Sequence, residues 1–300
     1  MILSFFVKNK MVEWFLEYIT YNLCYSDRTV NSYQDSLHRF WDYIAKFWHN
    51  IEKPNSITYD DINKRIVSQK NLSSKTINTR LSAIKTYFKW CIDNDIKCLD
   101  PKKIKSLKEH DKEIGYFSDV QKKQILNLVD QWFWNSEELQ IRTKLLVYIL
   151  MFTGLRIQEA LNIKTKDINE SLQIIGKGNI HRWTFLRPEI LDLAKEYLNK
   201  KKHYSDYLFS TVWNSKTSKV WYQLKQMTTQ NIFIQMSKKL WFHVHAHKFR
   251  HTYATWLLRL KWSNIYNIAR LLWHKNISTT QIYLWYNNSE LKKLQFSLKI

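Results

Sequence analysis

The chain has 300 residues, with 47 Lys or Arg against 26 Asp or Glu, and a formal net charge of +21. This length is enough for two medium-sized domains, each with its own core. So large a basic excess indicates a polyanionic partner. Nucleic acid fits best, although a ribosome-associated or membrane-surface factor can have the same composition.

Cysteine usage and hydropathy exclude two further classes of protein. Cys24, Cys91 and Cys98 have neither a C-x-x-C spacing nor an even-numbered framework, which argues against a disulfide scaffold and for a reduced intracellular protein. The opening residues carry no small-residue cleavage pattern, and no apolar run is long enough to span a bilayer. We therefore expect a soluble, cytoplasmic protein with no membrane contact.

Apolar residues recur at helical spacing in the first hundred residues and, with helix start signals, predict a small bundle of four helices over residues 1–101. The start signals are Ser26 with Asp27, Thr58 with Asp61, and Ser74. The apolar positions are Val12, Phe15, Leu16, Ile19, Leu23, Val30, Tyr33, Leu37, Phe40, Trp41, Ile44, Ile77, Leu81, Ile84 and Phe88.

A domain boundary is expected after this bundle. Asp100 and Pro101 end it, and the stretch from Lys102 to Glu113 is charged with few apolar residues, as in an exposed linker. We place the linker at residues 102–116 and a second domain at residues 117–300.

The second domain is predicted to be mainly helical with one β-hairpin, an α+β architecture. Ser118 with Gln121 starts a helix, and the run 145–151 is apolar on all sides, as in a buried helix. Extended runs at 172–175 and 181–185 flank the turn 176–179. A helix follows from about Pro188 to Lys201, and the segment 224–240 is a candidate for lying in or near a DNA groove.

Two motifs supply paired arginines. Arg156 lies in the stretch T-G-L-R-I-Q-E at 153–159, and Arg250 lies in H-K-F-R-H at 247–251. A phosphodiester that is attacked in line gains negative charge on its non-bridging oxygens, and two guanidiniums are natural stabilisers of that charge. His274 and Tyr283 follow later in the chain.

In order and spacing, these motifs resemble those of the tyrosine recombinase or phage integrase family, of the Xer-like kind. The resemblance implies that Lys177 in the G-K-G turn protonates the leaving 5′ oxygen and that His247 handles a proton. It also implies that His274 hydrogen-bonds the phosphate and that Tyr283 forms a 3′-phosphotyrosyl link. The implied catalytic residues are Arg156, Lys177, His247, Arg250, His274 and Tyr283.

Each of these residues has an ordinary structural explanation when it is taken alone. Tyr283 is one of 17 tyrosines, Lys177 can be a solvated hairpin tip, and the arginines can be surface charges. The joint order and spacing carry the assignment. A metal site formed by His243, His245, His247 and His251 is disfavoured, because neither a zinc-hydrolase glutamate nor a nearby cysteine accompanies them.

The family resemblance further implies an enzyme that cleaves and rejoins double-stranded DNA without metal, ATP or another cofactor. Its N-terminal domain would clamp DNA, holding phosphates with basic residues. Four protomers, or a paired recombinase, would assemble through a C-terminal tail. Two alternatives are a type IB topoisomerase-like enzyme and a DNA-binding protein that has lost catalysis. The tail's apolar positions are Leu291, Leu294, Phe296 and Leu298, which can equally pack on their own domain.

Glycine and tryptophan usage is unusual. The chain has 4 glycines and 14 tryptophans, whereas average usage would give roughly 21 glycines. Trp262 and Trp273 stand where the resembled family has glycine, and Trp241 stands where a turn residue is expected. One hypothesis is a source organism that reads UGA as glycine. UGG codons at positions 262 and 273 would contradict it.

Overall fold

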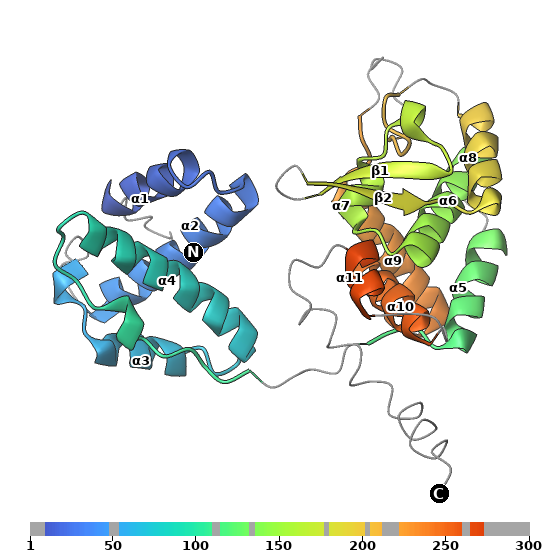
Figure 1. Cartoon of the computed structure of the whole chain (residues 1–300). Helices are drawn as coiled ribbons and strands as arrows, with labels where there is room; N and C mark the ends of the chain where they lie inside the picture. The colour runs from blue at the N-terminus through green and yellow to red at the C-terminus, as the bar shows by residue number, and fades with distance from the viewer. Residues whose placement is uncertain are drawn as a thin grey trace, which may run out of the picture. The chain divides into compact units, whose positions relative to one another are not determined.

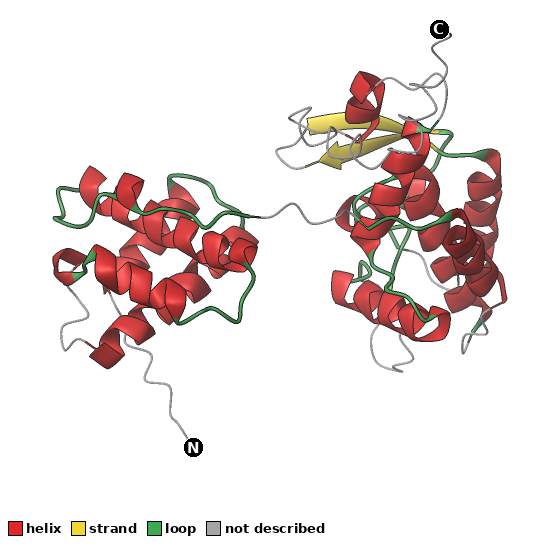
Figure 2. Cartoon of the chain, turned by 90° about the horizontal axis from the view of Figure 1, so that it is seen from below, coloured by secondary structure: helices red, strands yellow, loops and turns green. Residues whose placement is uncertain are grey.

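The computed structural model describes residues 10–47, 54–109, 115–131, 136–176, 180–201, 205–211, 222–259 and 265–272. Within these ranges the chain is mainly helical with one small antiparallel sheet, as predicted (Figure 2). The chain divides into two compact units, residues 1–112 and 113–300, and each is described by itself.

The first unit is the expected helical bundle (Figure 1). Apolar and aromatic side chains fill its core. The ring of Phe15 packs edge to face on Tyr87 and is tilted against Trp90, with ring centroids 5.4 Å and 5.8 Å apart. Its helices are α1 (Lys10–Tyr21), α2 (Asp27–Phe47), α3 (Tyr59–Val67) and α4 (Ser74–Asp93), with 3-10 turns at Pro54–Ser56 and Pro101–Lys103.

Helix caps in this unit follow the sequence signals, with one small shift. Thr58 and Asp61 form a reciprocal capping box at the start of α3, as predicted. The fourth helix is capped by Ser73 rather than Ser74, since the Ser73 side chain accepts from the Thr76 backbone N–H. Leu23, expected in the first helix, lies beyond its end and is partly exposed.

The stretch 102–109 differs from the exposed linker that its charge predicted. Ile104 is buried against the first unit, and the Asn78 side chain bonds both backbone groups of Leu107, donating to its carbonyl at 2.9 Å and accepting from its N–H at 2.8 Å. Ile104 and Leu107, together with the two hydrogen bonds of the Asn78 amide, hold this otherwise charged segment on the bundle.

The second unit is organised around one buried helix, α6 (Glu137–Thr153), which packs against the helices labelled α5, α8 and α10 in Figure 1. Its apolar run from Leu145 to Met151 is buried, as predicted, apart from the partly buried Tyr148. The remaining helices are α5 (Asp119–Gln131), α7 (Ile157–Leu161), α8 (Pro188–Lys200), α9 (Gln226–Leu240), α10 (Ala246–Leu258) and α11 (Ile265–Leu272), with a 3-10 turn at Thr165–Asp167.

Strands β1 (Ser171–Gly176) and β2 (Ile180–Phe185) form the expected antiparallel hairpin. Leu172 and Ile174 of β1 face the core. Their cross-strand partners on the same face are Thr184 and Arg182, which are also buried. On β2 the usual pattern is therefore inverted, because Trp183 and Phe185 point outward while an arginine points inward.

Trp241 ends α9 in a left-handed conformation, with φ of 59°, and is 94% exposed. A left-handed residue just after a helix is usually glycine, because a β-carbon there is strained. The structure thus places a tryptophan with little packing where a glycine suits the backbone.

In the part of the chain that the structure describes, no helix has the length and apolar character needed to cross a membrane.

Candidate active site

The T-G-L-R segment makes a sharp turn between α6 and α7. Gly154 has φ of +63°, and a β-carbon on it would lie 2.4 Å from Cδ1 of Tyr253. The Thr153 hydroxyl donates to the Ile149 carbonyl at 2.6 Å, which fixes the end of α6. Glycine is required here for its backbone conformation and for its small size. The turn delivers Arg156 to the N-cap position of α7.

Glu159 holds Arg156 in place from within the same motif. Its Oε2 accepts from the Arg156 backbone N–H at 2.8 Å, and its Oε1 accepts from Arg156 Nη1 at 2.9 Å. The Glu159 side chain is 7% exposed, whereas that of Arg156 is 44% exposed. A buried carboxylate thus anchors an arginine whose guanidinium still reaches solvent.

A second arginine joins this carboxylate from the hairpin. Nη2 of the buried Arg182 donates to Glu159 Oε2 at 2.6 Å, and its Nη1 donates to the Leu271 carbonyl. Burial alone would raise the pKa of Glu159, but Arg182 and then Arg156 outweigh burial and hold that pKa below its usual range. Glu159 is therefore a carboxylate shared by two guanidiniums.

Arg250 connects α10 to the Arg156 turn. The residue is 2% exposed; its Nη1 donates to the Gly154 carbonyl at 2.8 Å, and its Nη2 donates to the Leu272 carbonyl. Gly154 lies two residues before Arg156, so the structure brings the two predicted arginines to one region. Both are attached to rigid elements, as precise positioning requires.

The histidines cluster on and before α10. His247 lies one turn before Arg250 and packs edge to face on His251, with ring centroids 4.4 Å apart, while His243 and His245 are 4.8 Å apart. Burial, then the charges of His243, His247 and Lys248, lower the pKa of His245. Among the described residues, no group of three or more His, Cys, Asp or Glu side chains is arranged to hold a metal ion.

The structure thus describes three of the six predicted catalytic residues: Arg156, His247 and Arg250. Lys177, His274 and Tyr283 lie outside the described residues, as do Trp262 and Trp273. Sequence reasoning missed Arg182, which it treated as part of an extended run. The available signal was the inverted pattern of β2, with an arginine at a position that pairs with Ile174.

The structure thus combines a helical N-terminal unit, a mainly helical second unit with a hairpin, and two arginines near one turn. Residues 117–290 match the phage integrase family, and residues 12–95 match the N-terminal SAM-like domain of phage integrases. The chain therefore belongs to the phage integrase family.

Curated relatives and solved structures agree with this assignment. The chain is 26% identical to the tyrosine recombinase XerC of Staphylococcus epidermidis, covering 95% of this chain and 96% of the relative. It is 27% identical to XerC of Bacillus licheniformis, covering 97% and 96%. The XerH site-specific recombinase bound to a palindromic difH substrate is similar in fold, with a TM-score of 0.74 at 22% identity, covering 96% of this chain and 84% of that one.

The family assignment settles the class of activity. The chain is a tyrosine-type site-specific recombinase, an enzyme that cleaves and rejoins DNA strands. None of these matches supports the topoisomerase-like or the non-catalytic alternative.

Proposed function

We propose that Arg156 and Arg250 together bind the scissile phosphate of a double-stranded DNA site. The observation that carries this proposal is the Arg250 Nη1 bond to the Gly154 carbonyl, because it ties the two arginines to one turn. Their positive charge stabilises the negative charge that develops on the non-bridging oxygens during in-line attack. Phosphate binding would replace a bond from Arg250 to a neutral carbonyl with a stronger bond between two ionised groups.

The proposed nucleophile is Tyr283. Its phenolic oxygen attacks phosphorus, the bond to the 5′ oxygen breaks, and a 3′-phosphotyrosyl link and a free 5′ hydroxyl result. Lys177 donates the proton that the leaving 5′ oxygen takes up, His247 accepts the phenolic proton, and His274 donates a hydrogen bond to the phosphate. The new ester retains the energy of the original linkage. A 5′ hydroxyl of a partner duplex can then attack it and reseal the strand without ATP, metal or another cofactor.

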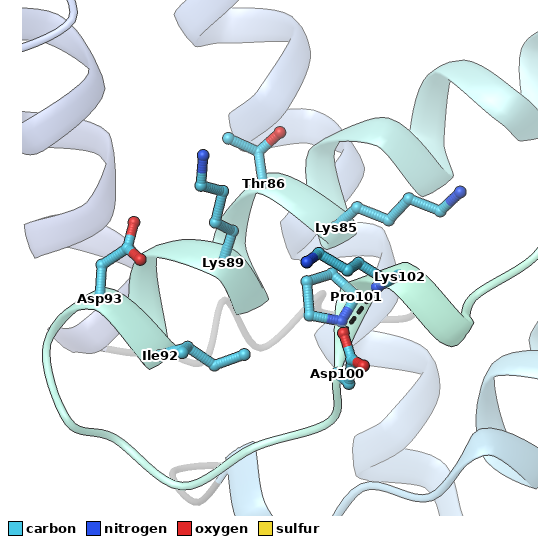
Figure 3. A pocket seen from close by; sticks show the side chains of 8 residues that line it. All are labelled: Lys85, Thr86, Lys89, Ile92, Asp93, Asp100, Pro101 and Lys102. Atoms are coloured by element: carbon cyan, nitrogen blue, oxygen red, sulfur yellow. Dashed lines mark hydrogen bonds between the residues drawn. The ribbon is translucent and has the colours of Figure 1, made fainter.

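The first unit would clamp DNA mainly through phosphate contacts. Basic residues alternate along its helices, and charges of this kind give affinity without reading sequence. A hollow of about 730 Å³ lies beside α4 and is lined by Lys85, Lys89 and Lys102 among others. Figure 3 shows these side chains. The proposed phosphate-holding residues are Arg28, Lys64, Arg65, Lys75, Arg80, Lys85 and Lys89.

The assembly follows from the chemistry of exchange. Two duplexes present four strands to be cut, so four protomers of this chain, or pairs with a second recombinase, are required for a full exchange. The tail with Leu291, Leu294, Phe296 and Leu298 would dock into a neighbouring protomer and link the subunits. The enzyme would act in the cytoplasm, where its DNA substrate lies.

Covalent trapping tests this proposal. The protein is incubated with nicked duplexes carrying its own flanking genomic DNA or a dif-type palindrome, and adducts that survive denaturation are counted. The proposal expects an adduct with the wild-type chain and none with Tyr283→Phe. DNA binding without any adduct, in a chain made with the amino acids that its own organism inserts, would overturn the nucleophile assignment.

A further inference from the structure

Arg182 has an unusual position for a charged side chain. It lies on the inward face of β2, opposite Ile174, and its side chain is only 3% exposed. A buried guanidinium is costly unless its donors are well paired. A hairpin needs only an apolar residue at such a place, so the arginine requires a reason beyond packing.

The contacts of Arg182 supply such a reason. One guanidinium joins three elements that lie apart in the sequence: β2, the Glu159 carboxylate of α7, and the Leu271 carbonyl near the end of α11. Glu159 in turn holds the Arg156 guanidinium at 2.9 Å. The chain of contacts from Arg182 therefore ends on the exposed arginine that the proposed reaction uses.

The second buried arginine of the site makes a parallel connection. Arg250 bonds Gly154 on one side of Arg156 and Leu272 at the end of α11, next to the residue that Arg182 bonds. Two arginines thus fasten the same end of α11 to the same turn. Of the two, only Arg182 makes this connection through a carboxylate that also binds Arg156. Loss of Arg182 would therefore release Arg156 while leaving the Arg250 bonds available.

We propose that Arg182 is a positioning residue, which fixes the Arg156 guanidinium through the shared Glu159 carboxylate. The inference rests on the proposed role of Arg156 at the phosphate. Without Arg182, Glu159 loses its buried partner and can reorient, carrying Arg156 with it. A misplacement of about 1 Å costs about 100-fold in rate, so Arg182→Met is expected to slow adduct formation by about that factor.

The matched control is Arg142→Met. Arg142 is also buried in the second unit, but it donates to the Ser210 carbonyl at 2.8 Å, and among the described residues it forms no hydrogen bond or ion pair with Glu159 or Arg156. Both variants lose a buried arginine and are compared at a temperature where both are folded. Arg182→Lys, which can still reach Glu159, is expected to recover part of the rate.

A substrate change separates positioning of Arg156 from general damage. In a methylphosphonate at the scissile position, a methyl group replaces one non-bridging oxygen, which removes the charge that Arg156 would neutralise. The proposal expects the 100-fold defect of Arg182→Met to shrink to about 10-fold or less on this substrate, as it should for Arg156→Ala. An equal loss in Arg142→Met and Arg182→Met, with no recovery on the methylphosphonate, would overturn it.

A second measurement needs no cleavage. In the chain labelled with ¹⁵N-arginine, the Nε–H resonance of Arg156 is assigned by its absence from Arg156→Lys. Arg182→Met should shift or broaden that resonance, and Arg142→Met should leave it in place. An unchanged resonance in Arg182→Met contradicts the inference. If the wild-type chain forms no adduct but Arg182→Met still shifts the Arg156 resonance, the result contradicts the proposed function alone.

Discussion

The two units treat their charged residues in opposite ways. In the described part of the first unit, the buried residues are almost all apolar or aromatic, and Asp61 is the one charged side chain among them. The described part of the second unit buries three arginines, Arg142, Arg182 and Arg250, together with Glu138 and Glu159. The first unit keeps cations on its surface, where they suit phosphate contacts, whereas the second uses them to fix geometry.

This difference has an energetic side. A core of aromatic contacts is stabilised by buried area, with no need for exact charge pairing. A buried ion pair contributes little net stability, yet removal of one partner is strongly destabilising because the other charge stays buried. The second unit therefore tolerates substitution of its buried charges less well, because those charges fix the arrangement around Arg156. The effects of substitutions in the two units should therefore differ in the property they change as well as in magnitude.

The largest effect is expected from Arg250→Lys. A lysine cannot reach both the Gly154 and the Leu272 carbonyls, and it loses the planar fork that suits a phosphate. Adduct formation at saturating DNA should fall by about 1,000-fold, the upper range for loss of a charge-stabilising donor. Arg259→Lys, at the C-terminal end of the same helix and paired with Asp119, is the control. Similar rates for both variants would remove Arg250 from the reaction.

Gly154→Ala should come next, as a loss of stability. The left-handed backbone costs an alanine about 1–2 kcal/mol, and the 2.4 Å approach to Tyr253 adds a clash with a partly buried ring. Denaturant titration of the second unit measures the change. In the double variant Gly154→Ala/Tyr253→Leu only the backbone cost should remain. Equal destabilisation in the single and double variants would show that Tyr253 does not restrict this position.

The same comparison shows what the sequence could predict. Helices, the Thr58 and Ser118 caps, and the hairpin strands depend on residues a few positions apart, so local patterns are enough to predict them. Arg156, His247 and Arg250 could be proposed from the sequence because their motif spacing is specific, and their catalytic roles stay predictions. Arg182 was missed because its partners, Glu159 and Leu271, are distant in sequence. Ile104 was missed because two apolar residues hardly change the charged composition of their segment.

A smaller and opposite effect is expected for Trp241→Gly. Because Trp241 is 94% exposed with φ of 59°, glycine removes backbone strain and loses almost no packing. The second unit should gain about 1 kcal/mol of stability. Asp95 in the first unit, with φ of 57°, is the matched position. Asp95→Gly should gain less, since aspartate tolerates this conformation better. A loss of stability in Trp241→Gly would argue against glycine as the natural residue there.

The smallest effect is expected on the surface of the first unit. Lys89 lines the hollow beside α4, as Asp93 and Asp100 also do, and in the described part of the chain it forms no ion pair. If it holds one phosphate, Lys89→Ala should reduce the slope of log affinity against log salt by about 0.9 and weaken binding uniformly across DNA sequences. The rate of adduct formation at saturating DNA should stay unchanged, unlike that of Arg250→Lys. A slower rate at saturation would mean that the first unit also affects the reacting site. It would contradict the view that cations of the first unit serve DNA binding alone.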